Sequence, residues 1–278
     1  MQNLMDKKYI FATLSGISLF FIIVLAAFTL APKQYELVKT VPVQGRYLTS
    51  DHLMQAYVID ENNQVLKYDT TGQLIGRFDE NRYGQITSVD ATSPFNTLMF
   101  YKDFATIVAV DNQLNARTLF RLPSIDINSV SAVALSHDNH LWLFDTEESK
   151  LKKITSKYDL VHESLPVNQF LDSEINPTFI VEKDKLVFVN DPEMGILVFD
   201  LYGSYYNSFP ITGIEHFQVI NKNIVFYDDS QLHLFDFMSF QMETLPMPLQ
   251  EDSVSHFQLN KDVLFVLGEK GMQIYRGK

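Results

Sequence analysis

A pattern of about forty residues recurs along this chain, and it constrains the fold more than any other feature. Four copies end with an apolar residue followed by proline: "FRLPS" (120–124), "ESLPV" (163–167), "NSFPI" (207–211) and "ETLPM" (243–247), whereas the first block, 56–78, lacks this ending. A further ending of this kind, "YELVKTVPV" (35–43), has no copy before it. A fixed period in this range is typical of proteins in which each copy is one supersecondary unit.

Within each copy, short runs of β-branched and aromatic residues alternate with turns rich in Asp, Asn, Gly and Ser. The clearest block predicts strands over 56–60, 64–69 and 73–78. Further strands are predicted before the last two blocks, over 215–220 and 255–260, and the last block stops after its third strand, 271–276. Strands joined in sequence order form an antiparallel meander.

The count of strands predicts an all-β fold. Five blocks supply four strands each, the last supplies three, and residues 35–43 supply a spare fourth strand. We therefore predict that 35–278 form a six-bladed β-propeller of four-stranded antiparallel blades, closed by the N-terminal strand. Closure of this kind removes the open edges of the last sheet.

The stretches "YVIDENNQVLKYDTTGQLI" and "LWLFDTEESKLKKI" resemble NHL repeats, with an apolar strand ending in Asp, a polar turn and a second strand. Over 35–278 the chain is similar to six-bladed NHL-repeat and TolB-like propellers. The resemblance implies a binding platform in most cases and a lactonase or another enzyme in a minority, so it does not by itself give a function.

The segment before the repeats is strongly apolar. Residues 9–31 contain no charged side chain, and a helix of this length spans the hydrocarbon layer of a membrane. Lys7 and Lys8 precede it, which favours a cytoplasmic N-terminus over 1–8 and a propeller on the far side of the membrane, joined by the linker 32–34. The alternative is a cleaved signal peptide and a secreted domain.

Two of the seven histidines are candidates for a channel site. His216 and His256 lie one repeat apart, at equivalent places on neighbouring innermost strands. The alternative is that both are packed or hydrogen-bonded imidazoles inherited with the repeat. We expect no catalytic residue, metal or cofactor, because the chain lacks cysteine, an HExxH motif and glycine-rich nucleotide motifs. The aspartates that end third strands are expected to stabilise turns: Asp69, Asp111, Asp200 and Asp236.

The formal net charge of −12 opposes binding to nucleic acid or to anionic headgroups. The acidic residues concentrate in the loops between second and third strands and between blades, so we place a docking surface for a basic protein partner there, with Asp145, Glu147 and Glu148. The N-terminal strand begins on the opposite side, which points this acidic side away from the membrane. A second candidate contact is the long connection 166–178 with Phe170 and Leu171, which could instead cap the propeller's own core.

We therefore expect a single-pass, non-enzymatic, extracytoplasmic propeller, periplasmic if the source is bacterial. Its predicted role is that of a protein-interaction scaffold or a subunit of an envelope complex. Two alternatives are a propeller hydrolase of the lactonase type and a sensor for a small ligand or glycan.

Overall fold

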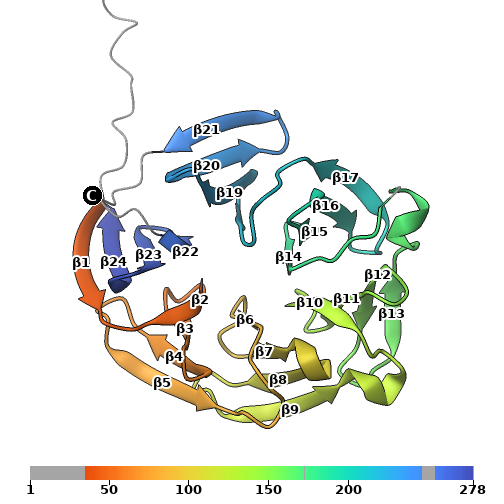
Figure 1. The fold of residues 1–278 in the computed structure, drawn as a ribbon, viewed down its shortest axis with the longest axis horizontal. Coiled ribbons are helices and arrows are strands. Elements are labelled where there is room, and N and C mark those ends of the chain that lie inside the picture. The colour runs from red at the N-terminus through yellow and green to blue at the C-terminus, as the bar shows by residue number, and fades with distance from the viewer. Residues whose placement is uncertain (1–34, 172, 246–253, 278) are drawn as a thin grey trace, which may run out of the picture. The chain divides into compact units, whose positions relative to one another are not determined.

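The computed structural model describes residues 35–171, 173–245 and 254–277. These residues form six four-stranded antiparallel sheets arranged radially around a centre, as Figure 1 shows. The predicted six-bladed propeller is therefore confirmed. Residues 1–34, to which the predicted N-terminal tail, transmembrane helix and linker belong, lie outside the described residues.

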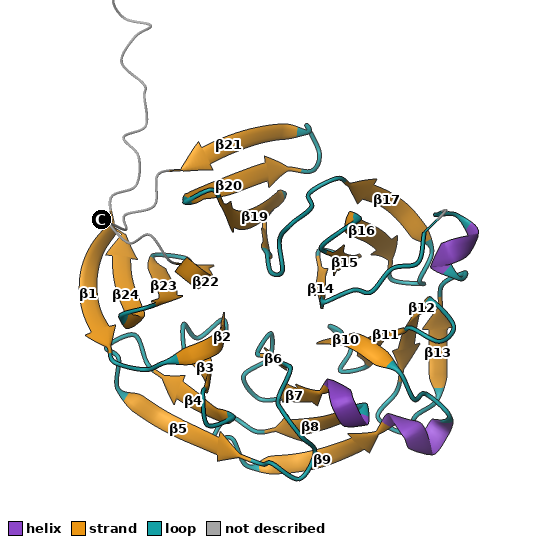
Figure 2. Cartoon of the chain, in the orientation of Figure 1, coloured by secondary structure: helices purple, strands orange, loops and turns teal. Residues whose placement is uncertain are grey.

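Blades 1 to 5 run from the innermost to the outermost strand in sequence order. Blade 1 consists of β2 (Gly45–Ser50), β3 (Ala56–Asp60), β4 (Gln64–Tyr68) and β5 (Leu74–Asp79). Blade 2 consists of β6 (Ser88–Asp90), β7 (Thr97–Tyr101), β8 (Thr106–Val110) and β9 (Ala116–Arg121). Blade 3 consists of β10 (Val130–Leu135), β11 (Leu141–Asp145), β12 (Lys150–Ile154) and β13 (Leu160–Glu163). Blade 4 consists of β14 (Phe179–Lys183), β15 (Leu186–Asp191), β16 (Gly195–Asp200) and β17 (Tyr205–Phe209). Blade 5 consists of β18 (Gln218–Ile220), β19 (Asn223–Asp228), β20 (Gln231–Asp236) and β21 (Gln241–Leu245). Within the described residues, three short 3-10 helices lie in the connecting loops (Figure 2): η2 (Lys102–Phe104), η3 (Leu122–Ile125) and η4 (Val167–Gln169).

Blade 6 is built from both ends of the repeat region. It contains β22 (Val254–Asn260), β23 (Val263–Gly268), β24 (Gly271–Gly277) and, as its outermost strand, β1 (Tyr35–Val41). Strand β1 pairs antiparallel with β24, from Tyr35 opposite Gly277 to Val41 opposite Met272. The predicted closure of the ring by the N-terminal strand is therefore confirmed.

The core lies between neighbouring blades. The second and third strands of most blades are buried along nearly their whole length, which explains why they read as continuous apolar runs instead of alternating ones. Between blades 3 and 4, for example, Trp142, Phe144 and Phe199 belong to one buried cluster. Each blade therefore needs both neighbours to bury its two faces, which makes closure a condition of stability.

The apolar–Pro endings have a structural reason in blades 4 and 6. The Val43 N–H donates to the Val41 carbonyl oxygen across Pro42 at 2.8 Å, and the Ile211 N–H donates to the Phe209 oxygen across Pro210 at 2.8 Å. These are tight γ-turns, whose central φ proline supplies. Beneath the first turn lies Gly271, where a Cβ atom would overlap the Val41 oxygen. The proline turns the chain sharply at the end of the fourth strand, and the glycine at the start of the third strand leaves room for that turn.

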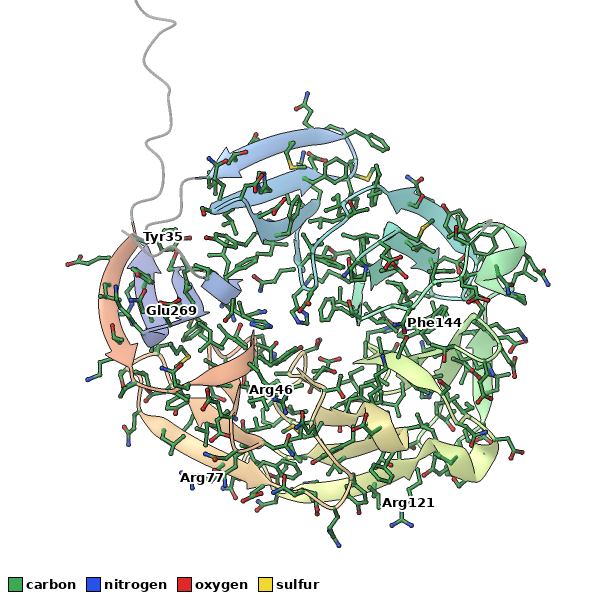
Figure 3. All side chains as sticks on the ribbon, viewed as in Figure 1. Tyr35, Arg46, Arg77, Arg121, Phe144 and Glu269 are labelled. Atoms are coloured by element: carbon green, nitrogen blue, oxygen red, sulfur yellow. The ribbon has the colours of Figure 1, made fainter. Side chains whose placement is uncertain are left out.

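The outermost strands run around the circumference (Figure 1), so the turn before each of them packs on the end of the preceding blade. Tyr158 contacts Phe120 in this way, with ring centroids 6.0 Å apart, and Phe240 contacts Phe209 at the same distance. At the break in blade 6, Tyr35 takes the place of such a turn and belongs to one apolar cluster with Leu245 of blade 5. Strand β1 begins opposite Gly277, the end of the third strand, as its place in the repeat predicts, and this start lies at the periphery beside blade 5 (Figure 3).

Candidate functional site

The two candidate histidines meet at the centre of the ring. The ring centroids of His216 and His256 are 4.9 Å apart. Tyr47 lies 5.1 Å from His216, and Phe179 lies 5.6 Å from it on another side. Because Tyr47 belongs to blade 1 and Phe179 to the opposite blade 4, these four rings span the central channel. We call Tyr47, Phe179, His216 and His256 the aromatic plug.

Both imidazoles of the plug are neutral at pH 7. Burial, and then the neighbouring His256, lower the pKa of His216 to about 3, and burial lowers the pKa of His256 to about 4. Neither ring nitrogen of His256 has a hydrogen-bond partner among the described residues, although both are buried. The pair therefore packs as two aromatic rings, and a metal or a proton would have to compete with that packing.

The plug occupies one level of the inner strands. Tyr47 pairs with Ile59, Phe179 with Asn190 and His256 with Leu267, each the penultimate residue of the second strand in its blade. In blade 2 the same level is occupied by a small residue, since Ser88 pairs with Phe100. The sequence singled out the two histidines through their spacing but missed Tyr47 and Phe179, because their equivalence depends on strand register.

A cavity of about 200 Å³ adjoins the plug, and most of the polar side chains that line it form hydrogen bonds between neighbouring blades. Gln218 donates to Gln258 at 2.8 Å. The Asp90 carboxylate accepts from the Leu135 N–H at 2.6 Å, and burial raises the pKa of this carboxyl group. The Glu182 carboxylate accepts from Trp142 Nε1 at 2.6 Å and from the His137 N–H at 3.0 Å.

These wall residues join neighbouring blades of the ring. Within the described part of the chain, no group of three or more His, Cys, Asp or Glu side chains is arranged to hold a metal ion.

The three acidic candidates of blade 3 have different environments. Asp145 is buried, and its carboxylate bonds to Lys152 Nζ at 2.7 Å and to the backbone N–H groups of Glu147 and Glu148. Glu148 lies 3.0 Å from both Lys150 and Lys152, and the hydrogen bond from Lys152, followed by that from Lys150, lowers its pKa. Glu147 is exposed. Asp145 thus fixes the turn that presents Glu147 and Glu148.

The same division applies to the other loops between second and third strands. Asp60 and Asp191 are buried and accept N–H groups of the turns that follow them. The exposed carboxylates of these loops define what we call the acidic loop face: Glu61, Asp103, Glu147, Glu148, Glu193, Asp228, Asp229 and Glu269. The same loops contain Lys102 and Lys270, and Lys150 begins β12 at the end of one of them.

Phe170 and Leu171 are half-buried and pack against the core cluster between blades 3 and 4. The Phe170 ring lies 4.7 Å from that of Tyr205. Ile175 of the same connection is buried. This placement agrees with the alternative in which the connection caps the core. Leu165, directly before this connection, is 70% exposed and was not singled out in the sequence.

The aspartates that end third strands stabilise turns, as predicted. In all four, the carboxylate accepts backbone N–H groups of the turn that follows: Asp69, Asp111, Asp200 and Asp236. The Asn115 N–H is the main reason why the pKa of Asp111 falls to about 2.

No family model matches the sequence, and no curated protein does. Among solved structures, the chain is similar to a streptogramin B lyase, with a TM-score of 0.61 and 13% identity over 89% of this chain and 98% of that one. It is similar to the WD40 domain of Neurospora crassa Pan2, with a TM-score of 0.61 and 9% identity over 89% and 96% of the two chains. A catalytically inactive virginiamycin B lyase from Staphylococcus aureus, with quinupristin, gives a TM-score of 0.60 and 10% identity over 88% and 100%.

At these identities the likeness shows the fold alone. It supports a β-propeller related in shape to lyase and WD40 propellers, while the narrower resemblance to NHL-repeat and TolB-like proteins stays a prediction. Among the described residues no helix is long and apolar enough to cross a membrane; the apolar run 9–31 lies outside them.

Proposed function

We propose that this protein is a membrane-anchored, extracytoplasmic propeller that recognises a basic protein partner through the acidic loop face. The observation that carries the proposal is the aromatic plug. Four packed rings span the channel at the level of His216 and His256, so the protein's own side chains fill part of the space most suited to hold a small substrate. The loops remain as the surface for recognition.

The charges of the loops favour a basic partner. Buried Asp60, Asp145 and Asp191 fix the turns, so the exposed carboxylates beside them are presented on a rigid frame. Carboxylates clustered on one side of a domain attract a basic surface, speed the encounter and make the association sensitive to salt. Glu147 and Glu193, on neighbouring blades 3 and 4, are exposed members of this set.

Charge reversal tests the proposal. The full chain, tagged at its C-terminus and extracted in mild detergent, is compared with the variant Glu147→Lys/Glu193→Lys for the recovery of co-purifying proteins at rising salt. We expect the variant to recover less partner and to lose the salt dependence, because both screening and reversal act on the same attraction. Buried Asp145 is left unchanged so that the fold is preserved.

The matched control reverses Asp184 and Asp262, which lie in loops between first and second strands. If the control variant loses as much partner as Glu147→Lys/Glu193→Lys does, the acidic loop face is not the docking surface.

A second candidate is the binding of a small polar ligand beside the plug. It is favoured by the unpartnered nitrogens of His256 and by a second cavity of about 270 Å³, which this residue lines together with Glu215 and Ser255. The change His256→Phe separates the two candidates. Partner recovery should survive this change if the loops bind the partner, and should fail if a ligand at the plug controls recognition.

A further inference from the structure

A patch of exposed apolar side chains lies on the periphery between blades 4 and 5. It consists of Tyr206, Met238, Phe240 and Met242, which are 66%, 69%, 64% and 48% exposed. We call these four residues the apolar rim. Tyr206, Met238 and Phe240 line a cavity of about 140 Å³ that continues down to buried Phe188 and Phe209. A contiguous patch of this kind differs from the single apolar residues scattered over most protein surfaces, and it indicates a contact with another apolar phase.

The turn that carries the rim is held in place. The Asp236 carboxylate accepts the N–H groups of Met238 and Ser239 at 2.9 and 3.0 Å, and the Phe240 N–H donates to the Asp236 carbonyl oxygen at 2.7 Å. The Phe240 ring contacts Phe209 and Phe235 at its base. Met238 and Phe240 are therefore exposed by a fixed turn.

The charge of this turn is compensated. Asp236 forms an ion pair with Lys222, and the hydrogen bond from Lys222 is the first cause of a lowered pKa at Asp236. Glu243, next to Met242, points to the other face of the blade because side chains alternate along a strand. The surroundings of the rim therefore carry little net charge that would oppose contact with a lipid surface.

The rim lies one strand away from the start of the propeller. Strand β21 begins directly after Phe240 and ends at Leu245, which shares an apolar cluster with Tyr35. A strand of this length spans about 17 Å. Only residues 32–34 separate Tyr35 from the apolar run 9–31 in the sequence, and three residues reach at most about 10 Å.

We infer that the apolar rim inserts into the interfacial layer of the bilayer, so that the propeller stands on the periphery of blade 5. This inference rests on the proposed membrane anchor at 9–31, which places lipid within reach of β1. Aromatic and methionine side chains suit the interfacial layer because they combine apolar area with tolerance of nearby polar groups. Blade 2, which lies opposite blade 5 in the ring (Figure 1), is then farthest from the membrane.

Single nitroxide labels test the inference, because the chain contains no cysteine and each introduced one takes a single label. The full chain is reconstituted in phosphatidylcholine vesicles as Phe240→Cys, and the accessibility of the label to oxygen and to a water-soluble nickel complex is measured. The controls are Phe95→Cys and Phe104→Cys in blade 2, whose side chains are 67% and 58% exposed. Phe95 lies between first and second strands and Phe104 between second and third, so they sample both sets of loops.

We expect a several-fold higher ratio of oxygen to nickel accessibility at position 240 than at 95 or 104. If the label at 240 is as accessible to nickel as the labels of blade 2, the inference is overturned. If the oxygen ratio is higher at 95 than at 240, the propeller contacts the membrane through its loops, and the inference is likewise overturned. Carbonate extraction of the same vesicles separates the two proposals. Release of the protein would overturn the anchor and the rim together, whereas retention with a nickel-accessible label at 240 would overturn the rim alone.

Discussion

Substitution of Gly271 by alanine tests how the ring is closed. Gly271 opens β24 with φ at +102°, and an added Cβ would overlap the Val41 carbonyl oxygen at the end of β1. Backbone strain of this kind costs roughly 1–3 kcal/mol. The overlap is with backbone, so it can be relieved only by moving β1 away from β24 or by distorting the turn.

Displacement of β1 has a cost of its own. Val41 and Val43 are each 7% exposed and belong to the cluster between blades 6 and 1. Full burial of such a side chain is worth roughly 1.5–3 kcal/mol. We therefore expect Gly271→Ala to lower the free energy of unfolding by about 4 kcal/mol or more, a large part of the ~5–15 kcal/mol typical of a domain.

The matched control is Gly213→Ala. Gly213 has φ at +78° but no atom within 4 Å of an added Cβ, so Gly213→Ala destabilises the fold through backbone strain alone, by roughly 1–2 kcal/mol. Both variants are unfolded in urea, and the transition is followed by the fluorescence of Trp142, the sole tryptophan, which is fully buried. If Gly271→Ala stays within about 1 kcal/mol of the control, the contact between β1 and β24 does not stabilise the closed ring to this extent.

Three further predictions follow from the plug, the long connection and the apolar run. The pKa values of His216 and His256, about 3 and about 4, lie below the unfolded value of about 6.5, so the unfolded state binds protons first as the pH falls. Stability should therefore be complete above about pH 6.5 and decline toward pH 4, and His216→Phe/His256→Phe should flatten this dependence in urea titrations; an unchanged slope would assign it to other groups. Phe170→Ser/Leu171→Ser should lower the free energy of unfolding by roughly 1–2 kcal/mol per residue, since both side chains pack on the core. If the double variant instead loses partner recovery while its melting transition is unchanged, the two residues belong to the docking surface. The native protein should resist carbonate extraction from membranes, and recovery of a soluble form beginning near Phe28 or Pro32 would instead indicate a secreted domain.

The sequence predicted the architecture because each blade repeats the same physical requirements. Apolar runs between polar turns marked the second and third strands, and the apolar–Pro endings marked the exits from several blades. The observed β1 (Tyr35–Val41) and β24 (Gly271–Gly277) agree with the predicted strands 35–43 and 271–276. The two innermost strands predicted by residue fared differently: 255–260 is observed as Val254–Asn260, whereas 215–220 is observed only as Gln218–Ile220.

The candidate sites were predicted only in part, because a linear pattern does not report burial or register. Asp145 and Glu147 look alike in the sequence, yet one is buried against Lys152 and the other is exposed. The partners of His216 and His256 in the plug could not be found without the register that brings Tyr47 and Phe179 to the same level. The direction of the outermost strands, which places the start of β1 at the periphery, depends on the twist within each blade.

Site-specific photo-crosslinking in living cells tests recognition through the acidic loop face most directly. A photoreactive amino acid is placed at Glu147 in the full chain, and at Asp184 in the comparison chain, and the products of irradiation are identified. We predict that position 147 captures a basic protein, that the product disappears when Glu193→Lys is added, and that position 184 does not capture it. Capture of the same protein from position 184 but not from 147 would contradict recognition through the acidic loop face.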